Sequence, residues 1–129
     1  MEIDPLITRA ILTVKKTDTL RAAAVAMMER GVGSAVVMTD GKPSGIITDR
    51  DALRVIARGD DPNQTTVGDC VKRILKTVTG AIDIVEAASL MRETGFRQLV
   101  VIDEHGNLAG VFSMRDLVVG LLEERGVSA

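Results

Sequence analysis

The apolar residues of this chain follow two spacings that alternate along it. Residues 11–14 and 35–38 are short, mostly apolar runs of strand length, which favour buried strands. Between them, apolar and alanine side chains recur every three or four positions after a cap at Asp18 or Thr19, which predicts a helix. We expect Gly31 to end that helix, because glycine readily adopts a left-handed backbone.

A hairpin and a second helix follow these elements. Residues 40–43 read Asp-Gly-Lys-Pro and predict a turn, after which residues 44–47 pair back as a strand. Thr48 or Asp49 is then placed to cap a helix that Gly59 closes.

The second half of the chain predicts the same order of elements. The expected elements are a strand near residues 75–78, a helix at 83–94, strands at 99–102 and 108–112, and a helix at 114–124. Each half therefore has the predicted order β-α-β-β-α, and a polar, proline-containing linker at 60–66 joins the halves.

The two halves are copies of one sequence unit. Segment 45–51 reads Gly-Ile-Ile-Thr-Asp-Arg-Asp, and segment 110–116 reads Gly-Val-Phe-Ser-Met-Arg-Asp, a shift of 65 residues. Before the hairpin the shift is 64 residues, as between Gly31 and Gly95, so one residue is inserted in the hairpin turn, where insertions are tolerated best. A doubled unit predicts a pseudo-twofold pair with clefts in which equivalent side chains face each other.

The composition suits one compact domain. The 129 residues are 46% hydrophobic, which favours a globular chain. Each half, of about 60 residues, would be marginal alone, so we expect the halves to share one core. Aromatic residues make up only 2%, so the core is expected to be aliphatic, and base stacking on aromatic side chains is disfavoured.

Charge and cysteine content narrow the class of function. The net charge is −2 and the pI is about 5.4, which disfavours nucleic-acid binding. A single cysteine, Cys70, cannot form an internal disulfide, as expected in a reducing cytoplasm. No apolar run approaches the ~20 residues of a membrane span, and no signal segment opens the chain. We therefore expect a cytoplasmic protein that binds neither membranes nor nucleic acid.

The repeated segment places a hydroxyl at a strand end and a carboxylate three residues later, in the first turn of a helix. The unpaired amides of that turn carry partial positive charge and form a seat for an anion such as phosphate. Thr48 is placed to cap the helix and touch the anion, and Asp51 to accept hydrogen bonds from the vicinal hydroxyls of a ribose. Ser113 and Asp116 repeat this arrangement.

From about residue 3 to residue 122, the chain resembles a tandem pair of cystathionine-β-synthase (CBS) domains, called a Bateman module. The signature Gly-h-h-Thr/Ser-x-x-Asp, with h apolar, occurs in both copies after a strand-helix-strand unit. The resemblance implies an α/β (α+β) fold of two pseudo-twofold-related β-α-β-β-α repeats sharing one core. Residues 1–129 then form a single module, with repeats at 3–59 and 67–125 and the linker at 60–66.

The resemblance also implies a regulatory module that binds an adenosine-containing nucleotide in the clefts between the repeats and relays its level to a partner. The candidate ligands are AMP, ADP and ATP, with NAD and S-adenosylmethionine less favoured, and no cofactor is required. Asp51 and Asp116 would hold ribose hydroxyls, and Thr48 and Ser113 would contact phosphate or ribose. The other implied contacts are Ile11, Ile46, Ile47, Leu75, Val111 and Phe112 around the base, and Arg50, Arg97 and Arg115 as phosphate partners.

The two clefts are expected to be unequal. Asp49 follows Thr48 in the first copy, whereas Met114 follows Ser113 in the second. An extra carboxylate disfavours an anion, so we expect one occupied cleft more often than two.

An alternative interpretation remains open. The Thr/Ser-x-x-Asp pairs are also common helix caps, so the chain could be a dimerisation or protein-interaction module with empty or vestigial clefts. A homodimer is expected in either case, through the alanine- and methionine-rich helix faces at residues 22–28 and 117–122, and any protein partner is unknown. No nucleophile with a neighbouring base is evident, and the single His105 with Cys70 gives no metal-binding cluster. We therefore expect neither enzymatic activity nor a metal site.

Overall fold

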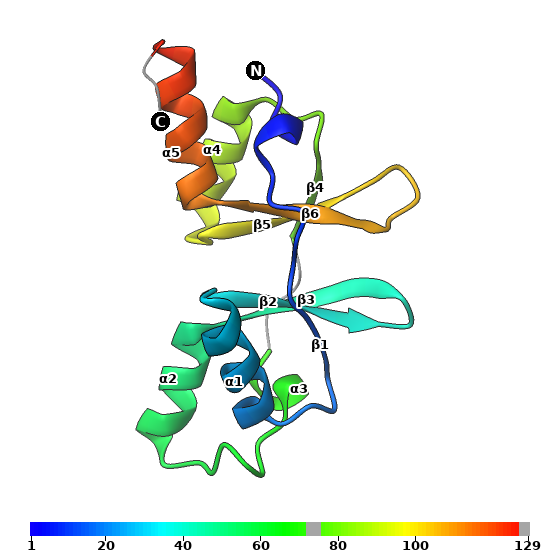
Figure 1. The fold of residues 1–129 in the computed structure, drawn as a ribbon, viewed down its shortest axis with the longest axis vertical. Coiled ribbons are helices and arrows are strands. Elements are labelled where there is room, and N and C mark those ends of the chain that lie inside the picture. Colours follow the sequence, from blue (N-terminus) through cyan, green and yellow to red (C-terminus); the bar gives the residue numbers. More distant parts are fainter. Residues whose placement is uncertain (72–75, 127–129) are drawn as a thin grey trace. The chain divides into compact units, whose positions relative to one another are not determined.

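The computed structural model describes residues 1–71 and 76–126, which form two compact units. One unit is Ile11–Leu75, called the first-repeat unit below. The second-repeat unit combines Met1–Ala10 with Lys76–Ala129. In Figure 1, each unit is a small sheet with helices packed on one of its faces.

The first-repeat unit is built around a three-stranded sheet. Its elements are β1 Thr13–Lys15, α1 Leu20–Arg30, β2 Ser34–Thr39, β3 Lys42–Thr48, α2 Asp49–Arg58 and α3 Val67–Cys70. The strand order is β1-β2-β3, in which β1 runs parallel to β2 and β2 antiparallel to β3. The helix α1 is the crossover between the parallel strands, and the predicted hairpin joins the antiparallel ones.

The second-repeat unit repeats this arrangement. Its elements are the 3-10 helix η1 Asp4–Leu6, β4 Thr77–Thr79, α4 Ile84–Thr94, β5 Gln98–Ile102, β6 Leu108–Ser113 and α5 Met114–Glu124. The strand order is β4-β5-β6, with the same parallel and antiparallel pairings as in the first sheet. The mixed α+β fold predicted from the repeat is confirmed.

The predicted helix ends are confirmed as well. Thr19 caps α1, where its hydroxyl accepts a hydrogen bond from the Ala22 amide. Gly31, Gly59 and Gly95 follow α1, α2 and α4, each with a left-handed backbone. These positions are set by local chemistry, which is why the sequence predicts them well.

Some elements differ from the prediction. The first strand begins at Thr13, so half-buried Ile11 precedes it. The strand expected near residues 75–78 is described from Thr77, and Leu75, an expected contact of the base, lies outside the described residues. The short helices α3 and η1 were not predicted, because three or four residues are too few to show a helical period.

Each unit has its own hydrophobic core cluster among the described residues. Ile47 and Val67 are fully buried in the cluster of the first-repeat unit. Ile3 and Phe112 are fully buried in the cluster of the second-repeat unit. Separate clusters form because each sheet is packed against the helices of its own unit.

Each core is completed by a segment that precedes the other repeat in the sequence. We call residues 1–10 the first leader segment and residues 65–71 the second. The first is held in the second-repeat unit, where the Ile3 amide donates to the Ile82 carbonyl at 3.1 Å. The second is held in the first-repeat unit, where the Val67 amide donates to the Asp18 carbonyl at 2.8 Å. The compact units therefore cross the repeat boundaries read from the sequence.

Candidate functional site

The first predicted binding motif lies where β3 ends and α2 begins. The Thr48 hydroxyl accepts a hydrogen bond from the Asp51 amide at 3.4 Å, and the Asp51 carboxylate accepts one from the Thr48 amide at 2.9 Å. This reciprocal capping box satisfies amides that the start of α2 would otherwise leave unpaired. The predicted hydroxyl and carboxylate are therefore neighbours.

The Asp51 carboxylate is almost completely buried. Asp51 is 3% exposed, and it is the one buried charged residue in the described part of the chain. Arg54, one turn later, donates from Nη1 to Asp51 Oδ1 at 2.9 Å, and the Thr48 hydroxyl lies 3.2 Å from Oδ2. Such partners are needed because moving an unpaired charge out of water costs much free energy.

Arg54 is the neighbour of the motif that sequence reasoning missed. It lies three residues after Asp51, a spacing that brings side chains together on a helix. The equivalent residue of the second repeat, 65 positions later, is Val119, which cannot form this pair. A comparison of the two repeats beyond the end of the motif would have found the difference.

The second motif lies where β6 ends and α5 begins. The Ser113 hydroxyl accepts from the Asp116 amide at 3.2 Å, and Asp116 Oδ2 accepts from the Ser113 amide at 2.8 Å. Asp116 is half-buried, and no cationic side chain of the described residues pairs with it. The same capping box therefore holds a more accessible carboxylate.

The three arginines predicted to contact phosphate are all exposed. Arg50 and Arg115 lie in the first turns of α2 and α5. The Arg97 carbonyl accepts a hydrogen bond from the Met114 amide at 2.9 Å, which holds residue 97 beside the start of α5. None of the three forms an ion pair with another described residue. Two arginines therefore border the Asp116 motif.

The residues expected to surround a base divide between the two faces of each sheet. Ile47 and Phe112 are fully buried in the two cores, so neither side chain is exposed to a ligand. Their neighbours Ile46 and Val111 alternate to the opposite face and belong to neither core cluster. Val111 is itself only 7% exposed and Ile46 is half-buried, so contact of these four residues with a base stays a prediction.

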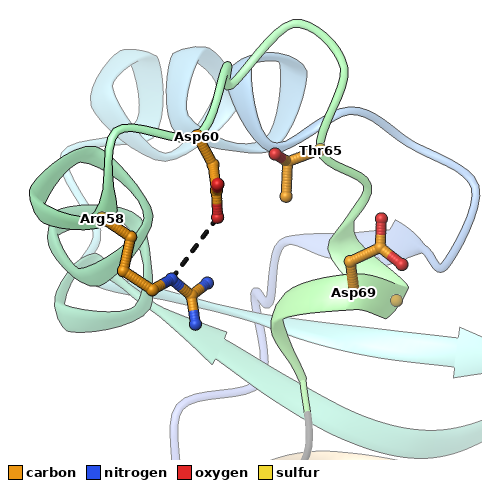
Figure 2. Close-up of a pocket in the computed structure, with 5 residues that line it drawn as sticks. Arg58, Asp60, Thr65 and Asp69 are labelled. Atoms are coloured by element: carbon orange, nitrogen blue, oxygen red, sulfur yellow. Dashed lines mark ion pairs between the residues drawn. The ribbon is translucent and has the colours of Figure 1, made fainter.

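A pocket of about 610 Å³ in the first-repeat unit contains none of these residues. It is lined by Arg58, Asp60, Thr65, Gly68 and Asp69. Figure 2 shows Arg58 turned toward Asp60, with Nε 3.4 Å from Oδ2. The Arg58 side chain is 45% exposed and that of Asp60 53% exposed, and exposed ion pairs contribute little to stability. We assign no ligand to this pocket.

Other kinds of chemistry find little support in the described residues. Burial raises the pKa of the Cys70 thiol, and the Asp51 carboxylate acts in the same direction, so the thiol is a poor nucleophile at neutral pH. Within residues 1–71 and 76–126, no three His, Cys, Asp or Glu side chains are grouped to hold a metal ion. No helix of this described part is long and apolar enough to cross a membrane.

The chain belongs to the CBS domain family. The family model of the CBS domain matches residues 2–58 and 67–123, which include both copies of the motif. The resemblance inferred from the signature is therefore confirmed. The chain is a pair of CBS domains of the general regulatory type. Among its relatives, the "Uncharacterized protein MK0525" of Methanopyrus kandleri is 33% identical over 112 residues, or 85% of this chain. This chain spans 57% of that relative's length.

Two solved structures share the fold. A putative signal-transduction protein with CBS domains from Burkholderia ambifaria has a TM-score of 0.89 at 28% identity, over 97% of this chain and 96% of that chain. The CBS domain protein PAE2072 from Pyrobaculum aerophilum, complexed with AMP, has a TM-score of 0.86 at 28% identity. That similarity covers 98% of this chain and all of the other.

Proposed function

We propose that this chain is a regulatory module that binds an adenosine-containing nucleotide of the AMP, ADP or ATP class and relays its level to a protein partner. The observation that carries the proposal is the half-buried Asp116 carboxylate at the start of α5, bordered by Arg97 and Arg115. A carboxylate accepts hydrogen bonds from ribose hydroxyls, and a guanidinium fork matches phosphate oxygens.

The AMP complex of PAE2072 supports the same ligand class. That protein is 28% identical to this chain over nearly its whole length. Relaying the nucleotide level requires that the nucleotide prefer one conformation of the module over another. The proposal therefore includes a conformational difference between the bound and free chain.

A thermal-shift titration with AMP, ADP, ATP, NAD and S-adenosylmethionine tests the proposal. A ligand that binds only the folded state stabilises it by about 2.7 kcal/mol at a hundredfold excess over Kd, which is several degrees for a domain of this size. We expect one adenosine compound to produce this shift, and the double variant Asp51→Asn, Asp116→Asn to lose it.

The chain offers a matched control for the loss of a helix cap. Thr66 and Asp69 form the same capping box at the start of α3, where we propose no ligand contact. Asp69→Asn should lower the melting temperature and keep the nucleotide-dependent shift. If none of the five compounds shifts the folded parent, the alternative function is favoured, a dimerisation or protein-interaction module with empty sites.

We also propose that the chain forms homodimers. The side chains of Leu53 and Ile56 on α2 are exposed, as are those of Val118 and Leu121 on α5. Leu53 and Ile56 correspond to Val118 and Leu121 at the repeat shift of 65 residues. These four residues, called the apolar stripes below, lie three positions apart on each helix. A second copy carries the same stripes, which suits the self-complementary contact of a twofold dimer.

A further inference from the structure

The two capping boxes use the same backbone hydrogen bonds. They differ in the partners of the second carboxylate oxygen, the one that does not take part in the capping box. In both, the carboxylate Oδ2 accepts a hydrogen bond from the backbone amide of the cap residue, at 2.9 Å in the first repeat and 2.8 Å in the second. The other oxygen, Oδ1, therefore decides whether a ligand hydroxyl is bound.

In the first repeat this oxygen is already occupied. Asp51 Oδ1 accepts from Arg54 Nη1 at 2.9 Å, and the Asp51 side chain is 4% exposed while that of Arg54 is 50% exposed. A ribose would have to displace the guanidinium from a buried carboxylate, and breaking a buried ion pair is costly. Arg54 thus takes the place that a ligand would need.

In the second repeat the same oxygen remains accessible. Val119, which replaces Arg54, has no donor. Asp116 is half-buried, and its Oδ1 receives no hydrogen bond from the residues that the structure describes. Two vicinal hydroxyls of a ligand would supply the donors that this oxygen lacks.

The charged residues beside the two capping boxes also favour binding at the second repeat. The Asp49 amide donates to the Gly33 carbonyl at 3.0 Å, and the Met114 amide to the Arg97 carbonyl at 2.9 Å, so residues 33 and 97 are structurally equivalent. A Cβ on Gly33 would lie 3.3 Å from Asp49 Oδ2. The first repeat therefore has a carboxylate where the second has an arginine, and only the second favours a phosphate.

We propose that only the second repeat binds the nucleotide, and that the Arg54–Asp51 ion pair closes the first site. Asp116 Oδ1 accepts the ribose hydroxyls, and Arg97 contacts the nearest phosphate. This inference rests on the proposed function, and it identifies Arg54 and Val119 as the residues that determine which repeat is occupied.

Isothermal titration of the intact chain with AMP, ADP and ATP tests the inference. We expect one nucleotide per chain. Val119→Arg places a guanidinium three residues after Asp116, and it should weaken binding at least tenfold. Val119→Met adds length without charge and should bind as the parent does. Arg54→Val should open the first site to a second, more weakly bound nucleotide, because Asp49 still disfavours a phosphate there.

The outcomes separate the inference from the proposed function. Two nucleotides per parent chain would overturn the inference and leave the function standing, as would a Val119→Arg variant that binds like the parent. So would a loss of binding in Asp51→Asn but not in Asp116→Asn. A folded parent that binds none of the three nucleotides contradicts the proposed function itself. If Arg54→Val fails to fold, the Val119 variants still decide the question.

Discussion

At the scale of single residues, the glycine that opens the CBS signature is explained by packing. A Cβ on Gly110 would lie 2.7 Å from the Thr8 carbonyl oxygen and 2.9 Å from Ile7 Cδ1. Thr8 and Val111 exchange two backbone hydrogen bonds of 2.9 Å, so the first leader segment cannot easily move aside. We predict that Gly110→Ala lowers the free energy of unfolding by about 1–3 kcal/mol, measured by urea denaturation.

The equivalent glycine of the first repeat provides the control. A Cβ on Gly45 would lie 2.7 Å from Val71 Cγ1, which is a side-chain methyl and not backbone. Rotation of Val71 would relieve much of that contact, so Gly45→Ala should cost less than Gly110→Ala. An equal or larger loss in Gly45→Ala would contradict this explanation of the signature glycine.

At the scale of elements, the stability of each unit depends on a leader segment that precedes the other repeat in the sequence. Ile3 is fully buried in the core of the second-repeat unit, and Val67 in that of the first-repeat unit. Ile3→Ala should therefore destabilise by about 2–5 kcal/mol. Hydrogen exchange should quicken mainly in β4, β5, β6, α4 and α5, although the substitution is at the start of the chain.

Val67→Ala is the reciprocal variant. It removes a smaller side chain from the second leader segment, so the loss of stability should be smaller. Its faster exchange should appear mainly in β1, β2, β3, α1 and α2. If both variants loosened the same unit, the exchange of leader segments between the repeats would be wrong.

Sequence reasoning succeeded where structure depends on neighbours along the chain. The helix that Gly31 ends and the capping box of Ser113 with Asp116 follow from local spacing and backbone preference. The leader segments could not be placed this way, because Ile3 pairs with Ile82 through backbone groups that carry no sequence signal. The pairing of Arg54 with Asp51 could be predicted from their spacing of three residues, but Arg54 lies outside the repeated segment 45–51.

At the scale of the whole molecule, the apolar stripes on α2 and α5 predict self-association. Leu53 is 66% exposed and Ile56 63% exposed. Burying a side chain of this size contributes roughly 1.5–3 kcal/mol. We expect the parent to sediment at twice its chain mass of 13.8 kDa, and Leu53→Lys with Ile56→Lys to weaken the dimer at least tenfold.

The control adds the charge to an exposed apolar residue outside the stripes. Val85 on α4 is 62% exposed, so Val85→Lys should leave the dimer intact if the stripes are the contact. Substituting Val118 and Leu121 by lysine tests the second stripe separately. This stripe is proposed as a contact because its residues are equivalent to Leu53 and Ile56 in the other repeat. A parent that sediments as a monomer at all accessible concentrations, or a double-lysine variant that dimerises like the parent, would remove the apolar stripes as the interface. Since nucleotide binding is assigned to Asp116 and not to the stripes, the dimer-deficient variants should retain the one nucleotide per chain.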